Sequence, residues 1–333
     1  MSSDDERNRQ VGRIPGQAKP PVPPLLGVAF GILVVSTSSI VTRYAQAFAP
    51  SLVIAAWRLS IASAVLAPIV LGRERQALRR LTRREIGLGL ASGCLLALHF
   101  ATWIASLEYT TVASSVVLVS TMPLFVAVLG RFTLREPITR PIILGISLAL
   151  VGGVAIGLGD ACTWQAGLRC PSLADFTGQT AFLGDALAVA GALAGSGYLL
   201  IGRRLRAGLP LTVYIGLSYG TAAVVLIALM FLAGETPFGF PPSAYLLFTF
   251  LALGPQLLGH SSFNWALRYL SAAVVALTLL GETVGSTILA FLLLHERPSS
   301  LKLAAIALIL AGIYVASRAQ PAQPASHPEG AAV

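Results

Sequence analysis

The chain has 333 residues, of which 55% are hydrophobic and 11% charged, and its net charge is +9. A soluble domain carries roughly 25% charged residues, so this composition excludes a soluble globular enzyme and a disordered chain and indicates a membrane protein. The positive charge does not indicate nucleic-acid binding, because the basic residues lie between long apolar runs and not on one solvated face.

Ten segments are long enough to cross a bilayer, which takes about 20 mostly apolar residues per helix. Turn and charge signals such as Ala49-Pro50 and Glu296-Arg297-Pro298 separate them. The first is predicted to be a retained helix, because its apolar stretch is longer than the core of a signal peptide. The segments span approximately 25–46, 50–71, 86–107, 110–133, 138–157, 181–202, 210–233, 243–267, 271–294 and 299–317.

Lysine and arginine are concentrated in alternate loops. The loops on the side of the N-terminus carry 18 of the 23 basic residues, whereas the opposite loops carry 4. Because positive loops stay in the cytoplasm, we predict a multi-pass protein of the plasma or inner membrane with both termini cytoplasmic. Residues 1–24 and 318–333 are predicted to be disordered tails. The external loop 159–180 holds Cys162 and Cys170, either as a disulfide or as two unpaired thiols.

The two halves of the chain align after a shift of 160 residues. The shift places Leu107-Glu108-Tyr109 on Leu267-Arg268-Tyr269 and Glu136 on Glu296. Five spans in each half, an odd number, make the second half enter the membrane from the opposite side. Residues 25–158 and 181–317 are therefore predicted to form an inverted repeat, which is typical of secondary transporters.

Several short motifs carry a family resemblance. They include Leu134-Arg135-Glu136-Pro137 in the first half and Asn264-Trp265-Ala266-Leu267-Arg268-Tyr269 and Gly281-Glu282 in the second. Each half resembles an EamA domain of the drug/metabolite transporter superfamily. The resemblance implies an all-α polytopic fold of ten transmembrane helices in two five-helix repeats, with amino acids, metabolites or cationic drugs as substrates. The family usually has proline after the acid at Glu282, and this chain has Thr283, which removes the usual reason for a helix break there.

Two charged residues lie inside predicted spans, where charges are expensive and usually functional. Glu282 is near the middle of segment 271–294, where it either exchanges a proton, neutralises a cationic substrate or joins helices by a hydrogen bond. Arg58 lies about eight residues inside the second segment. It either snorkels towards the outer surface, pairs with another polar group or binds a substrate carboxylate.

Other polar residues recur at helical spacing. His99 and Trp103 are four residues apart and share a helix face, as do His260 and Asn264. Together with Tyr198, they are interpreted either as the lining of a substrate cavity or as interhelical packing and hydrogen bonding. The hydroxyl groups of residues 36–39 are expected to bond to their own helix or a neighbouring one, with contact to the substrate as the alternative. Six G-x-x-x-G pairs, expected to pack helices closely, are Gly27/Gly31, Gly89/Gly93, Gly153/Gly157, Gly191/Gly195, Gly216/Gly220 and Gly281/Gly285.

The sequence contains no phosphate-binding G-x-x-x-x-G-K-[ST] loop, no His/Cys cluster with metal spacing and no nucleophile–base pair. We therefore expect neither an enzyme nor a cofactor or metal. The predicted function is secondary active transport of small metabolites, amino acids or drug-like compounds, as an exporter that works by alternating access, with protons as a candidate coupling ion. The alternative is a flippase for an amphipathic or lipid-linked substrate. The expected partners are a small-molecule substrate and the lipid bilayer, and the protein is a monomer or a homodimer.

Overall fold

The computed structural model describes residues 20–110, 112–161, 163–164, 168–169, 179–294 and 300–318. Cys162, Cys170 and most of the two predicted tails lie outside these residues. The helices of the described part are α2 (Pro24–Val35), α3 (Ser38–Gln46), α4 (Ser51–Gly72), α5 (Arg75–Arg79), α6 (Arg83–Tyr109), α7 (Val112–Val119), α8 (Met122–Thr133), α9 (Arg140–Ala161), α11 (Gln179–Arg206), α12 (Leu211–Leu232), α13 (Pro242–Leu251), η1 (Ala252–His260), α14 (Ser261–Ala266), α15 (Ala272–Thr278), α16 (Gly281–Leu294) and α17 (Ser300–Arg318).

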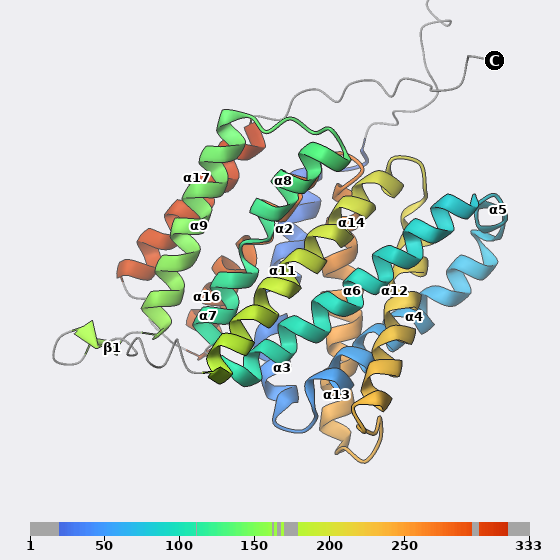
Figure 1. Ribbon diagram of the computed structural model, residues 1–333, viewed down its shortest axis with the longest axis horizontal. Coiled ribbons are helices and arrows are strands. Elements are labelled where there is room, and N and C mark those ends of the chain that lie inside the picture. Colours follow the sequence, from blue (N-terminus) through green and yellow to red (C-terminus); the bar gives the residue numbers. More distant parts are fainter. Residues whose placement is uncertain are drawn as a thin grey trace, which may run out of the picture.

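Helices account for almost all of the described structure (Figure 1). Two-residue strands β1 (Thr163–Trp164) and β2 (Leu168–Arg169) form an antiparallel pair in the segment between α9 and α11. Each of the ten predicted segments is helical. Eight of the resulting helices are long and apolar enough to cross a membrane, and two apolar helices, Val117–Thr133 and Arg140–Ala155, are shorter. The helical membrane fold is confirmed, and the count of ten spans stays a prediction.

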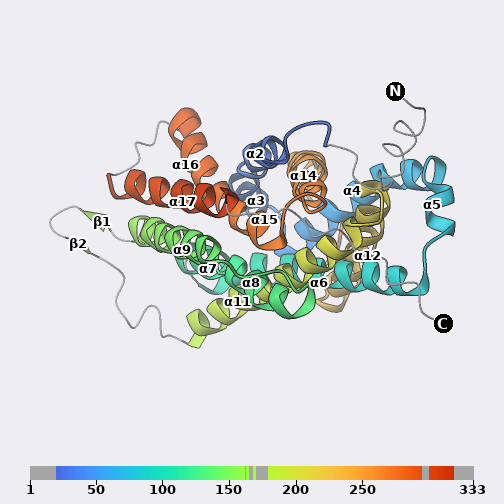
Figure 2. The same cartoon turned by 90° about the horizontal axis from the view of Figure 1, so that it is seen from above.

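The two halves of the chain interleave. Helix α6 packs against α11 and α12, α4 packs against α12, and α9 packs against α17. Each of these pairs takes one helix from each half. The α9–α17 pair lies side by side in both views and forms one side of the molecule, whereas α4 and α5 lie at the other (Figures 1 and 2). The halves therefore share one helical core and are not two separate domains.

Glycine permits the closest of these helix contacts. A Cβ atom on Gly312 of α17 would lie 2.5 Å from the carbonyl oxygen of Gly145 of α9, and a Cβ on Gly145 would lie 2.6 Å from the Gly312 carbonyl oxygen. Both glycines of four predicted G-x-x-x-G pairs likewise face a neighbouring helix. Gly153 and Gly220, from the other two pairs, have no neighbouring atom within 4 Å of a Cβ built there, so close packing is wrong at these two positions.

A single added methyl group should separate α9 from α17. Gly312→Ala places its Cβ against backbone atoms, which cannot rotate away, and overpacking of this kind typically costs about 1–3 kcal/mol. We expect the thermal unfolding midpoint of the purified protein to fall. Gly220→Ala, the matched control on α12, adds the same methyl group in open space and should leave the midpoint unchanged. An equal response of the two variants would contradict the packing role of Gly312.

Three of the predicted spans are interrupted. The breaks lie between α2 and α3, between α7 and α8, and between α15 and α16. At the last break the N–H groups of Leu280 and Glu282 donate to carbonyl oxygens three residues back, at 3.1 and 2.9 Å, which is the pattern of a tighter 3₁₀ turn. The shift of 160 residues places the α7–α8 break, which Pro123 follows, on the α15–α16 break. The second half therefore breaks at the equivalent position without a proline.

Contacts with α2 and α3 stabilise the break before α16. The Ser36 hydroxyl donates to the Ile32 carbonyl oxygen at 2.6 Å and lies 3.3 Å from the Glu282 carbonyl oxygen. In return, the Ser286 hydroxyl donates to the Ser36 carbonyl oxygen at 3.0 Å. Two interrupted helices thus meet at their breaks, where side-chain hydroxyls bond to exposed backbone groups. The expected bond of Ser36 to its own helix is confirmed, and it also reaches the opposite half.

Candidate functional site

Arg58 on α4 is buried among the helices, with 1% of its surface exposed. Its Nε donates to Oε1 of Gln256 at 2.8 Å and its Nη1 donates to the Ser38 hydroxyl at 3.1 Å. The guanidinium carbon lies 4.5 Å from the centre of the Phe100 ring, a cation–π contact. The snorkelling interpretation of Arg58 is therefore wrong, because an amide, a hydroxyl and an aromatic ring hold the charge inside the bundle.

Gln256, the main partner of Arg58, was not among the predicted site residues. It is fully buried and lies in η1, a π-helix that also contains Pro255. π-Helical turns are rare and occur frequently at functional sites. The signal available in the sequence was an uncharged polar side chain directly after a proline inside an apolar span. Ser38 and Phe100 were also missed as neighbours of Arg58, because these contacts join helices that are distant in sequence.

Glu282 lies in the first turn of α16 and is partly buried. Its carboxylate interacts electrostatically with Arg58. Within the described part of the chain, however, this carboxylate makes no hydrogen bond, and the ion pair found there joins Arg203 and Glu136. The charges of Arg58 and Glu282 thus influence one another, but no ion pair joins the two side chains among the described residues.

Aromatic side chains lie near Arg58, and Phe100 links them to its guanidinium. His99 and Trp103 stack with their ring centres 6.2 Å apart, which confirms that they share one face of α6. His99 Nδ1 lies 2.8 Å from the Gly191 carbonyl oxygen, and because a carbonyl only accepts, Nδ1 carries the hydrogen. His260 places its ring edge-on to Phe100, with centres 5.6 Å apart. Phe100 therefore connects His260 to the Arg58 guanidinium.

Asn264 and Tyr198 belong to an adjoining buried network. Asn264 Nδ2 donates to the Tyr198 hydroxyl at 2.5 Å and to the Tyr219 hydroxyl at 3.2 Å. The Tyr219 hydroxyl in turn lies 3.3 Å from the Ser261 hydroxyl and 3.5 Å from the carbonyl oxygen of Gln256. The two networks therefore meet at η1, and all the predicted site residues lie in or beside them.

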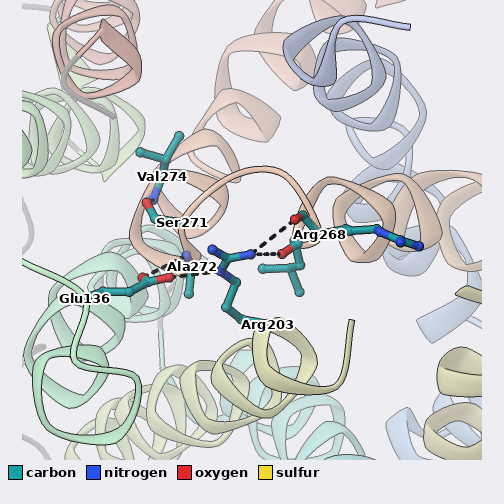
Figure 3. A network of polar contacts seen from close by, with 7 residues as sticks. Glu136, Arg203, Arg268, Ser271, Ala272 and Val274 are labelled. Atoms are coloured by element: carbon teal, nitrogen blue, oxygen red, sulfur yellow. Dashed lines mark hydrogen bonds and ion pairs between the residues drawn. The ribbon is translucent and has the colours of Figure 1, made fainter. Parts of the chain in front are cut away.

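A third polar network, separate from these two, joins four segments at one end of the bundle (Figure 3). Arg203 of α11 forms an ion pair with Glu136, Nε to Oε1 at 2.9 Å, and its Nη1 donates to the carbonyl oxygens of Leu267 and Arg268 at 2.8 and 3.3 Å. The other carboxylate oxygen of Glu136 accepts from the N–H of Ala272 at 3.2 Å. The segment after α8 is thereby tied to the ends of α11 and α14 and to the start of α15.

A metal ion would require a cluster of ligating side chains among the described residues. In the residues that the structure describes, no group of three or more His, Cys, Asp or Glu side chains could hold a metal ion. The polar contacts of the described part are hydrogen bonds and the Arg203–Glu136 ion pair.

Apolar helices of spanning length around buried polar side chains indicate a multi-pass membrane protein. Its sequence matches the profile of the EamA-like transporter family twice, over residues 23–158 and 182–318. The chain belongs to this family, which confirms the resemblance derived from its motifs and indicates a transporter rather than an enzyme.

Relatives and solved structures agree with this assignment. The uncharacterized transporter YyaM of Bacillus subtilis (strain 168) is 24% identical over 258 residues, which cover 76% of this chain and 79% of that protein. The uncharacterized transporter YetK of the same organism is 30% identical over 142 residues, or 40% of each chain. One solved crystal structure superimposes with a TM-score of 0.71 at 21% identity, over 89% of this chain and 96% of the other, and therefore has the same fold.

Proposed function

We propose that this chain is a secondary active transporter that exports small metabolites, amino acids or drug-like compounds across the cell membrane. The observation that carries the proposal is that two ionisable side chains, Arg58 and Glu282, lie among apolar helices with no ion pair between them in the described part of the chain. Charges at membrane depth are costly and are found mainly where they serve a pathway. Two charges that do not neutralise one another are available to a substrate or a proton.

The interrupted helices support alternating access. In transporters built from inverted repeats, discontinuous helices form the site near the midplane, and one repeat rocks against the other. Here the α7–α8 and α15–α16 breaks occupy repeat-related positions, and Glu282 follows the second break. Ten spans, an inverted arrangement of residues 25–158 and 181–317 and cytoplasmic termini complete this proposal, for a monomer or a homodimer.

The Arg203–Glu136 network supports a conformation closed on the cytoplasmic side. The bias of positive charge among the loops supports a cytoplasmic position for the ends of α8, α11 and α14, and the network ties these ends to α15. Release of the substrate to the exterior is compatible with this state. Exposure of the site to the cytoplasm requires the network to break.

Glu282 is proposed to couple transport to protons. A carboxyl group without a fixed partner in a water-poor bundle can bind a proton in one state and release it in another. Its position beside Arg58 makes protonation and substrate binding interdependent, because each changes the charge that the other meets.

Replacing Glu282 by glutamine should abolish pH-dependent transport in proteoliposomes while the protein stays folded. The amide has nearly the shape of the carboxyl group but cannot exchange a proton. A thermal-shift screen against metabolites identifies the compound to be assayed, because a ligand stabilises the folded state. Glu74→Gln is the matched control, since Glu74 accepts a hydrogen bond from Thr212 outside the site and the amide oxygen can still accept it. Full pH-driven transport by Glu282→Gln would rule out the coupling role.

A further inference from the structure

Two neighbouring buried hydrogen-bond donors have no acceptor among the described residues. Arg58 Nη2 and Gln256 Nε2 are both buried without a hydrogen-bond partner in the part of the chain that the structure describes. Their side chains are 1% and 0% exposed, and the bond between Arg58 Nε and Gln256 Oε1 joins them at 2.8 Å. Buried donors are nearly always satisfied in folded proteins, so two of them on adjoining side chains indicate a missing acceptor.

We infer that Arg58 and Gln256 form a subsite for a carboxylate group of the transported compound. This inference rests on the proposed transport function and names one chemical feature of its substrate. A carboxylate has two oxygens that can accept from two donors at once, and an arginine side chain provides both the charge and the directed N–H groups for such a contact. The remaining bonds of Arg58, to Gln256 and Ser38, fix the guanidinium so that Nη2 is the group left for a ligand.

The charges near the subsite favour a monoanion. Of the described residues, the two buried cations are Arg58 and Arg206, and Arg206 is engaged with the carbonyl oxygens of Asn264 and Leu209. Glu282 adds a negative charge close to Arg58. The unpartnered Nη2 of Arg58 can pair with one negative charge of a ligand, whereas a second negative charge, as in a phosphate monoester, would have no partner and would be repelled by Glu282.

The π-helix η1 presents Gln256 to Arg58. Pro255 has no N–H to donate, and the wider turn of η1 accommodates it next to the buried glutamine. Gln256 therefore has two functions in this subsite. Its Oε1 positions the guanidinium, and its Nε2 is itself a donor to the ligand.

Benzoate and benzamide are the probes that test the subsite. They share a flat ring that suits the surrounding aromatic side chains, and only benzoate carries a carboxylate. We expect benzoate to raise the thermal unfolding midpoint of the purified protein in a concentration-dependent manner and benzamide to have no comparable effect. Gln256→Leu should weaken benzoate binding about tenfold, as loss of one hydrogen bond to a charged group predicts. Gln46→Leu, at the end of α3, is the matched control and should bind benzoate as the unmodified protein does.

A second variant protects the test against misfolding. Gln256→Glu keeps an acceptor for Arg58 and supplies it with an ion pair, but the new carboxylate occupies the place of the donor and should abolish benzoate binding. Benzoate binding that is absent in the unmodified protein, equal to that of benzamide, or unchanged in both Gln256 variants overturns the inference. So does binding that appears only in Glu282→Gln, because Glu282 would then be the natural occupant.

Transport measurements separate this inference from the proposed function. A protein that binds benzoate through Arg58 and Gln256 but moves no solute across proteoliposomes would retain the subsite and lose the transporter proposal. Normal transport by both Gln256 variants would instead retain the transporter proposal and overturn the proposed subsite.

Discussion

Replacing Arg58 by leucine should abolish transport while the helical bundle still folds. The substitution removes the buried positive charge that the proposed site offers to a substrate and to Glu282. Loss of two charge-assisted hydrogen bonds predicts a fall in transport of at least about 100-fold, or roughly 2.7 kcal/mol. Stability should fall by about 1–3 kcal/mol, because the buried Oε1 of Gln256 loses its donor, a loss that a protein with the usual stability of about 5–15 kcal/mol survives folded.

Two further variants test whether the loss of transport is specific to the guanidinium of Arg58. Arg58→Lys keeps the charge but not the planar group that bonds to Gln256 and Ser38, so we expect partial activity. Arg43→Leu removes an exposed arginine from α3 and should transport normally. The measurements are initial rates in proteoliposomes and the thermal unfolding midpoint of each variant. Normal transport by Arg58→Leu would show that Arg58 serves folding only.

Breaking the Arg203–Glu136 network should open the end of the bundle that the proposal assigns to the cytoplasm. Glu136→Ala removes the ion pair and the bond to the Ala272 N–H, both shown in Figure 3. Because the two charged side chains are less than one third exposed, we expect a change of about 1.4 kcal/mol in the conformational equilibrium, which is tenfold in population.

Thiol labelling from the cytoplasmic side measures that population. In a background without the three native cysteines, Thr278→Cys introduces a thiol at a buried position near the end of α15. Labelling by a membrane-impermeant reagent should be about tenfold faster with Glu136→Ala than without it. Arg204→Ala removes a neighbouring exposed arginine and should not change the rate. Equal labelling in all three proteins would show that the network does not control access.

The helices were predictable because each is a long apolar run between polar or proline-containing turns, a property that every residue of the run shares. The ends of the helices were less predictable. Helix α6 begins at Arg83, before the predicted residue 86, because Thr82 and Glu85 form a capping box. Local side-chain bonds of this kind depend on a few atoms and extend a helix beyond its apolar part.

The candidate site was predictable in its charges and not in their partners. Depth in the membrane marked Arg58 and Glu282, but the direction of the Arg58 side chain depends on Gln256, which lies 198 residues later in the chain. The break before Glu282 has the same origin, since contacts with Ser36 stabilise it without a proline. Tertiary contacts decide both features, and a single sequence does not specify which distant residues meet.

The interleaving of the two repeats has a consequence for biosynthesis. Helix α9 is synthesised before α17, so the Gly145 surface gains its partner, Gly312, only after the second repeat has been made. Neither repeat is then an independent folding unit. Two separately translated halves would become stable only in the same membrane, where each supplies the helices that the other lacks.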